Sequence, residues 1–247
     1  MRETIESIGT AAQPGFNALL EDVFSLNVRG LQTLSDLYAR PKRVFDNARV
    51  IDWANQHTPT IRLTFSLITV YMLLSFFWAA EDGPLYQMLF TQLETLKASE
   101  PGLPPVEQMI EGWFAAYSFT YPFVYMFVHL LVGSLVFVWG KSTSWTTRLR
   151  MYFGLCAVGM SVALITTAAL PLISVEQIGI YTLATMTVGL LAYGGTYARA
   201  MAGTMSLGAL IWRAPFIALF ITLVDAIIAI LTTFGSGVWV GYQGARG

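Results

Sequence analysis

Long runs of apolar residues dominate the hydrophobic pattern of this chain. An α-helix needs roughly 20 mainly apolar residues to cross the hydrocarbon core of a membrane. Five runs meet that requirement: Thr60 to Ala80, Trp113 to Trp139, Met151 to Leu172, Gly179 to Arg199 and Ala214 to Gly235. Within each run the apolar residues are continuous and do not alternate with polar ones, which favours helices over the strands of a barrel. The pattern predicts an all-α, polytopic membrane protein with five transmembrane helices over residues 60–235.

Charge enters these runs at few positions. Arg62 lies in the first turn of the first run, from which its long side chain can reach the headgroups. Asp225 is the only charged residue inside the fifth run. Pro122 lies within the second run, so we expect a kink, a tilt or a first turn at the membrane interface there.

The first 59 residues read as an amphipathic segment that stays in the cytoplasm, without a cleaved signal peptide. Apolar residues recur at helical spacing from Phe16 to Tyr38. Asn27 and Gly30 are expected to interrupt this helix.

A second amphipathic helix is expected from Pro41 to Gln56, because proline suits the first turn of a helix. Its apolar face either lies on the inner leaflet or packs on the cytoplasmic ends of the spans. The basic residues beside that face, which would meet anionic headgroups, are Lys42, Arg43 and Arg49.

The loop over residues 81–112 is expected to hold an outer amphipathic helix. Its apolar stripe consists of Leu85, Met88, Leu89, Leu93 and Leu96. This helix either rests on the outer leaflet or offers its stripe to a partner protein. Residues 236–247 are expected to form a short external tail.

The distribution of Lys and Arg gives the expected orientation, since cytoplasmic loops carry an excess of both. Two of the 14 Lys and Arg residues, Lys97 and Arg246, fall on one side of the five-span topology. The others fall on the opposite side: Arg2, Arg29, Arg40, Lys42, Arg43, Arg49, Arg62, Lys141, Arg148, Arg150, Arg199 and Arg213. We therefore expect a cytoplasmic N-terminus and a periplasmic C-terminus.

Composition agrees with a membrane protein and excludes several classes of function. Apolar types make up 55% of the chain and charged types only 12%, whereas a globular domain carries about a quarter charged residues. The mean hydropathy is +0.58. A net charge of −1 gives no basic field for nucleic acid. Cys156 is the only cysteine, so no internal disulfide or multi-cysteine metal site can form, and no cofactor is expected.

Two ionisable residues, His129 and Asp225, are expected deep in the membrane. At 1.5 Å per residue, about eleven and about twelve residues from the inner ends of their runs, both lie roughly 16–18 Å deep. Equal depth permits a pair, which is either a proton or cation site or a structural hydrogen bond between two helices. His129 also admits a bond to a chlorophyll-type magnesium, although Tyr125, four positions earlier, leaves little space for a macrocycle.

The fourth run has a face of small and weakly polar residues at steps of three and four. These residues are Thr182, Thr185, Gly189, Ala192 and Thr196. Small residues allow helices to approach closely in a membrane, so we expect this face to pack against another helix; a substrate path is the alternative. Gly154, Ala157 and Ser161 make a matching stripe on the third run. The two runs are expected to pack as a hairpin.

Common catalytic motifs are missing from the sequence. It has no G-x-x-x-x-G-K-[ST], no H-E-x-x-H and no G-x-S-x-G. An intramembrane aspartyl enzyme needs a second deep carboxylate beside Asp225, and none is expected. The sequence favours a protein that is not an enzyme.

The segment from Arg29 to Val44 reads RGLQTLSDLYARPKRV. It resembles the pre-membrane segment of bacterial inner-membrane proteins in which a T-L-x-D-L-x-x-R-P run precedes the spans, among them bacterial relatives of the Yip family. Eukaryotic Yip proteins are trafficking factors with a D-L-Y-G-P signature, which is absent here because Ala39 follows Tyr38. The resemblance implies the five-span plan and a bacterial inner membrane, and it transfers no site residue.

These features favour an accessory or scaffold subunit of a larger membrane complex. Its expected contacts are membrane lipids and either other membrane subunits or further copies of itself. One alternative is a small transporter or channel-like protein that uses His129 and Asp225. Another is a lipid-interacting membrane organiser that uses Lys42, Arg43 and Arg49.

Overall fold

The computed structural model describes residues 28–50, 56–78, 83–140 and 143–244, and these residues contain helices and no β-strand. The α-helices are α2 (Val28–Ala39), α3 (Pro41–Asn47), α4 (Thr60–Trp78), α5 (Pro84–Ser99), α6 (Val106–Leu135), α7 (Trp145–Ala169), α8 (Ile178–Met201) and α9 (Leu207–Gly244). Two short 3₁₀ helices, η2 (Leu170–Leu172) and η3 (Val175–Gln177), connect α7 to α8. The all-α prediction is confirmed for this part of the chain.

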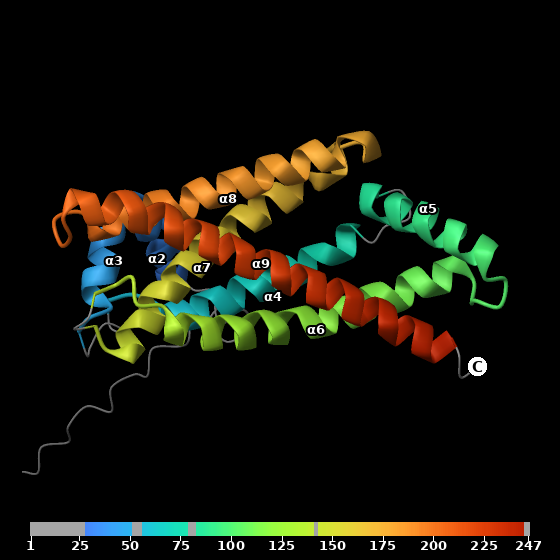
Figure 1. Ribbon diagram of the computed structural model, residues 1–247, viewed down its shortest axis with the longest axis horizontal. Coiled ribbons are helices and arrows are strands. Elements are labelled where there is room, and N and C mark those ends of the chain that lie inside the picture. The colour runs from blue at the N-terminus through green and yellow to red at the C-terminus, as the bar shows by residue number, and fades with distance from the viewer. Residues whose placement is uncertain (1–27, 51–55, 79–82, 141–142, 245–247) are drawn as a thin grey trace, which may run out of the picture.

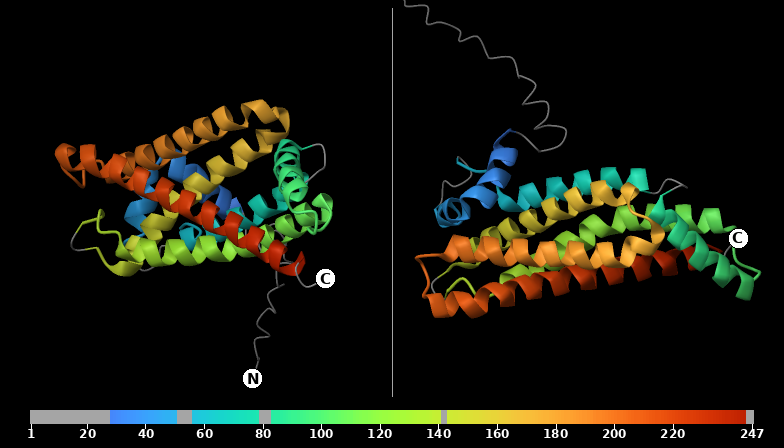
Figure 2. Two further views of the ribbon diagram at one scale, coloured as in Figure 1. Left: turned by 45° about the vertical axis from the view of Figure 1, so that its right-hand side comes forward. Right: turned by 90° about the horizontal axis from the view of Figure 1, so that it is seen from above.

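The long helices lie lengthwise in one bundle (Figure 1). Helices α4, α7 and α9 run in one direction along it, and α6 and α8 run in the other. We call the end that carries α2 and α3 the basal end, and the end that carries α5 the distal end. The same arrangement is seen from two further sides in Figure 2.

Among the described residues, four helical segments are long and apolar enough to cross a membrane, namely Val106–Leu135, Trp145–Leu172, Val175–Met201 and Leu207–Gly241. The fold is therefore compatible with that of a multi-pass membrane protein. Helix α4 is also apolar, over Thr60–Leu74, but this stretch is shorter than the other four. The role of α4 as a fifth span stays a prediction.

Several helix boundaries differ from the predicted ones. Helix α6 begins at Val106, so the end of the expected outer loop is helical, and Pro122 is accommodated inside one continuous helix. Helix α9 has 38 residues and continues to Gly244, so most of the expected tail, residues 236–247, extends the last helix. Apolar periodicity marks where a helix is buried in lipid, and it does not mark where the helix ends in water.

Helix α7 occupies the centre of the bundle. Every residue from Met151 to Val162 is buried. The other long helices surround it and keep one side outward. On α6 the outward residues fall one turn apart: Phe119, Phe123, Phe127, Leu131 and Leu135. Apolar side chains at an exposed, regular spacing are what a lipid-facing helix surface requires.

Helix α3 packs on the basal ends of the spans, which decides between the two predicted positions of its apolar face. Val44, Phe45 and Ala48 are each 1% exposed and belong to the main core. The centroid of the Phe45 ring lies 5.8 Å from that of Trp139. A Cβ on Gly154 would lie 3.4 Å from Phe45 Cε2, so the ring also packs on this glycine. The basic residues Lys42 and Arg43 stay about half exposed on the other side.

Helix α2 is also held against the bundle. The Tyr38 hydroxyl lies 2.7 Å from Ser161 Oγ on α7 and 3.2 Å from the Val158 carbonyl oxygen. Burial raises the pKa of Tyr38 and outweighs the opposing effect of the bond to Ser161, so the hydroxyl keeps its proton at neutral pH.

The predicted interruption at Gly30 is wrong, because Gly30 is a buried residue inside α2. The other predicted break, Asn27, lies outside the described residues, as do residues 16–27 of the helix expected from Phe16 to Tyr38; the rest of that helix is present in α2. Helix α3 ends at Asn47, and most of its predicted continuation to Gln56 also lies outside them.

The outer amphipathic helix is present as α5, and much of its stripe contacts this chain itself. Leu89 and Leu93 pack on the cluster of Val106, Met109 and Ile110 at the start of α6. Leu96 remains 45% exposed. The predicted choice between leaflet and partner omitted this third possibility, because the helical start of α6 was expected to be loop.

Replacement of Phe45 by Ala should detach α3 from the bundle and lower stability, since removal of a buried phenyl ring costs about 3–5 kcal/mol. Thermal unfolding of the detergent-solubilised protein measures the effect. Phe127→Ala, on a side chain that is 63% exposed, is the matched control. A loss of stability that is equal in both variants would contradict the packing of α3 described here.

Candidate functional site

A chain of hydrogen-bonded polar side chains crosses the interior of the bundle. His129 Nε2 lies 3.0 Å from Asp225 Oδ1, and His129 Nδ1 lies 2.9 Å from the Tyr152 hydroxyl. The Tyr193 hydroxyl donates to Asp225 Oδ2 at 2.6 Å. The order along the chain is Tyr152, His129, Asp225 and Tyr193, which we call the polar chain. Its members come from α7, α6, α9 and α8 respectively.

The structure thus brings together the two deep residues that the sequence places at equal depth. Depth along a helix follows from the constant rise per residue. The lateral direction of each side chain follows from how the helices pack, which the sequence pattern does not give. Tyr152 and Tyr193 were not predicted as members of the site, because aromatic residues are common throughout the runs.

His129 is enclosed on all sides. Its side chain has no exposed surface, and the Tyr125 ring centroid lies 4.1 Å from the imidazole centroid. The Cys156 sulfur lies 3.7 Å from Nδ1. Both ring nitrogens are therefore engaged by this chain, which leaves neither for the axial magnesium bond considered above. The Asp225 side chain is 30% exposed, so the polar chain reaches the surface of the bundle at that residue.

The hydrogen bonds fix a consistent set of proton positions. An ionised Asp225 only accepts, so His129 Nε2 carries a hydrogen and donates to Oδ1. A neutral His129 then accepts at Nδ1 from the Tyr152 hydroxyl. Tyr193 supplies a second donor to the carboxylate. In this state every member has a partner and the polar chain carries one negative charge.

Two glycines provide the space that the tyrosines occupy. A Cβ on Gly133 of α6 would lie 2.6 Å from the Tyr152 ring, and a Cβ on Gly159 of α7 would overlap the hydroxyl and ring of Tyr193. Close approach of helices in membranes commonly depends on such small residues. The role of these two glycines was not predicted, because neither lies in the small-residue stripes of the third and fourth runs.

The predicted small-residue face of the fourth run changes in exposure along α8. Thr196 is 2% exposed, Thr185, Gly189 and Ala192 are half-buried, and Thr182 is exposed. A Cβ on Gly189 would meet no atom within 4 Å. The large buried residues of α8 are Tyr193 and Tyr197, which lie at its basal half. On α7, Ser161 bonds to Tyr38 of α2, so that part of the predicted stripe faces the N-terminal helices.

Among the described residues, no group of three or more His, Cys, Asp or Glu side chains is arranged to hold a metal ion. His57, the other histidine, lies at the basal end, where its Nε2 is 3.2 Å from Asp36 Oδ2. The predicted basic residues Lys42, Arg43 and Arg49 are exposed on or next to α3.

Comparison with known proteins finds no matching family model, curated protein or solved structure. The Yip-like resemblance of the segment before the first span therefore stays a prediction.

Replacement of Gly159 by Ala should push Tyr193 away from Asp225 and lower the melting temperature, since the new methyl group occupies the space of the ring. Gly189→Ala on α8 is the matched control, because its methyl group enters open space and should leave the melting temperature unchanged or raise it. Thermal unfolding in detergent compares them. Equal melting temperatures for the two variants would argue against the contact between Gly159 and Tyr193.

Proposed function

We propose that the chain crosses the membrane five times, with its basal end in the cytoplasm, and that α4 is the first span. In support, α4 is apolar over Thr60–Leu74 and runs beside α7. The Thr60 hydroxyl donates to the Arg150 carbonyl at 2.6 Å and the Thr64 hydroxyl to the Phe153 carbonyl at 3.0 Å. A helix so attached to the buried α7 lies at the same membrane depth.

We propose further that the protein is a small transporter or channel-like protein whose polar chain binds a proton or another monovalent cation. One observation carries this proposal: each of the four longest helices contributes one member to a single hydrogen-bonded chain. Ionisable groups within spans commonly mark ion pathways and proton relays. A structural bond between two helices would need only two of these groups.

Charge gives the physical reason for binding a cation. With Asp225 ionised and His129 neutral, the site holds an uncompensated negative charge in a medium where that costs several kcal/mol. One added proton converts the pair into imidazolium and carboxylate, with no net charge. His129 Nδ1–H then donates to the Tyr152 oxygen, so the Tyr152 hydroxyl hydrogen must turn away. Proton binding therefore reverses the hydrogen bond between α6 and α7 and keeps the bond from His129 to Asp225 of α9.

Access to the site favours movement of the ion by way of Asp225. Its side chain is 30% exposed, whereas His129 has no exposed surface. An ion thus meets the carboxylate first and the imidazole second. Tyr125, Tyr152 and Cys156 close the site behind the imidazole.

Proton flux into liposomes tests this proposal. Purified protein in liposomes under a pH gradient should raise the rate of internal acidification, read with an entrapped pH-sensitive dye. Asp225→Asn and His129→Gln should return the rate to that of protein-free liposomes, because each removes a charge-changing group and keeps its approximate shape. Asp46→Asn, at a half-exposed surface pair with Lys42, is the control and should retain the wild-type rate.

A purely structural role of the polar chain predicts a different outcome. Asp225→Asn would then lower the melting temperature, while the wild-type protein would not exceed protein-free liposomes under gradients of H⁺, Na⁺ or K⁺. That combination would refute the transport proposal.

The accessory-subunit hypothesis is a second candidate, and a groove between α6 and α9 favours it. The groove has a volume of about 580 Å³ and is lined mainly by small and apolar residues, among them Gly112, Ala116, Gly235 and Trp239. Ser236 also lines it, is 1% exposed, and its hydroxyl has no hydrogen-bond partner among the described residues. A transmembrane helix of a partner subunit that carries a polar residue would fill the groove and satisfy this hydroxyl.

Co-purification in a mild detergent tests the second candidate. Wild-type protein should retain a membrane subunit that Ser236→Leu loses, since the larger side chain occupies the groove. Thr233 lies three residues before Ser236, is exposed and does not line the groove, so Thr233→Leu should retain the subunit. A wild-type protein that migrates as a lone monomer on native gels would eliminate this candidate.

A further inference from the structure

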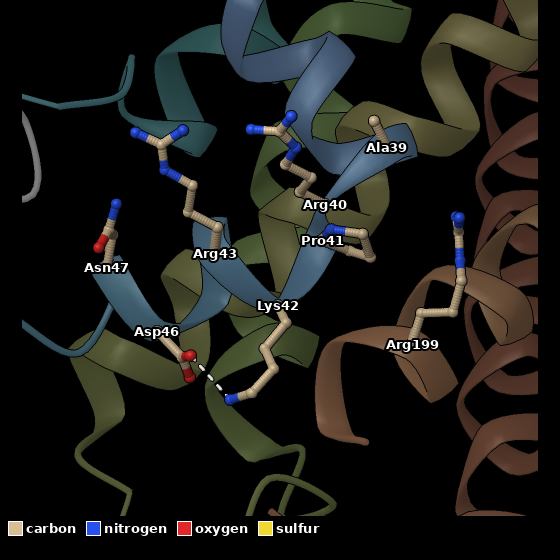
Figure 3. A pocket seen from close by; sticks show the side chains of 8 residues that line it. All are labelled: Ala39, Arg40, Pro41, Lys42, Arg43, Asp46, Asn47 and Arg199. Atoms are coloured by element: carbon tan, nitrogen blue, oxygen red, sulfur yellow. Dashed lines mark hydrogen bonds and ion pairs between the residues drawn. The ribbon is translucent and has the colours of Figure 1, made fainter. Parts of the chain in front are cut away.

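A cleft at the basal end gathers basic side chains from two separate parts of the chain. Its volume is about 580 Å³, and its lining includes Arg40, Lys42 and Arg43 next to or on α3, together with Arg199 in the last turn of α8. Figure 3 shows Arg40 and Arg43 extending to the same side, with Arg199 across from Ala39 and Pro41. Arg199 lies far along the chain from Lys42 and Arg43, so the sequence pattern does not group the three residues.

The positive charge in this cleft is only partly compensated. Its one carboxylate, Asp46, accepts from Lys42 Nζ at 2.8 Å. Arg43 lies 4.0 Å from Asp36, which His57 approaches more closely, at 3.2 Å. Within the described ranges, neither Arg40 nor Arg199 lies in ion-pair distance of a carboxylate. Two guanidinium groups therefore remain available to an anion.

The cleft lies where a membrane would place its headgroups. Arg199 is two residues before the end of α8, a helix that is long and apolar enough to span. Beneath the cleft, Val44 and Phe45 of α3 are buried against the basal ends of the other spans. The Arg199 Nε donates to the Gly195 carbonyl at 3.3 Å, which holds the side chain along α8 and leaves its terminal nitrogens unbonded within the described structure.

We propose that this cleft binds a phosphate group, and that its natural source is the headgroup of an anionic phospholipid. The planar guanidinium of arginine matches two phosphate oxygens at once, which a point charge does not. A volume of about 580 Å³ accepts a glycerophosphate headgroup. The exposed Arg40 side chain, which Figure 3 shows directed away from Arg199, would turn toward α8, so that a bound phosphate connects the two residues and joins the N-terminal helices to the fourth span through a lipid.

This site is separate from the polar chain and does not depend on ion transport. It is also more specific than a basic surface that meets a negatively charged leaflet. A diffuse surface would respond to the number of charges removed, whereas the cleft requires particular ones.

Lipid titration of the full-length protein in a neutral detergent tests the proposal. Phosphatidylglycerol should raise the melting temperature in a saturable way, and phosphatidylcholine should not. The double variant Arg40→Gln/Arg199→Gln should bind phosphatidylglycerol about thirtyfold more weakly, since each cation near a surface contributes about 1 kcal/mol. Both side chains are exposed, so the melting temperature without lipid should stay that of wild type.

The matched control removes charge from the same region outside the cleft. Arg29→Gln/Arg49→Gln loses as many charges from exposed positions on α2 and next to α3 that do not line the cleft, and it should bind like wild type. Inorganic phosphate is the second probe: a shift with phosphatidylglycerol alone identifies the lipid, and an equal shift with inorganic phosphate identifies a soluble phosphate compound. No shift with either probe, or equal weakening in the two double variants, would overturn the site.

Discussion

The carboxyl group of Asp225 imposes the strictest condition on this structure. It lies within a helix that is otherwise apolar through its middle, where a charge is costly unless other groups bond to it. Its two oxygens are satisfied by His129 from α6 and Tyr193 from α8, and His129 in turn requires Tyr152 from α7. One costly residue thus determines the neighbours of α9 on two sides. The glycines at 133 and 159 follow from the same condition, since the tyrosines need their space.

The basal end obeys a different rule, because charge there meets headgroups and water. Arginine and lysine side chains remain exposed around α3, while Val44, Phe45 and Ala48 close the core beneath them. The contrast between an enclosed, nearly neutral interior and an open, basic end is what a membrane demands of one chain. It also explains why the two proposed sites take opposite ligands, a cation in the interior and an anion at the end.

Much of the fold and part of the site could be predicted from the sequence. The apolar runs gave the long helices, and the constant rise per residue gave the common depth of His129 and Asp225. Helix ends were less predictable: α6 begins and α9 ends outside the long apolar runs, where charged residues or glycines interrupt the apolar pattern. The role of Gly159 was inaccessible, because a glycine that makes space for a distant ring looks like any other in the sequence. Arg199 and Arg40 line the same cleft because of how α8 packs in the bundle, which the sequence pattern does not predict.

Helix α7 has twelve consecutive buried residues, from Met151 to Val162, and it contacts both the N-terminal helices and the polar chain. This buried segment of α7 cannot tilt or rotate without displacing the side chains that are packed around it. We therefore expect a conformational change of this protein to move the outer helices relative to the buried segment of α7. The Tyr38 hydroxyl bonds to Ser161 of α7, so we expect α2 to keep its position relative to α7 in such a change.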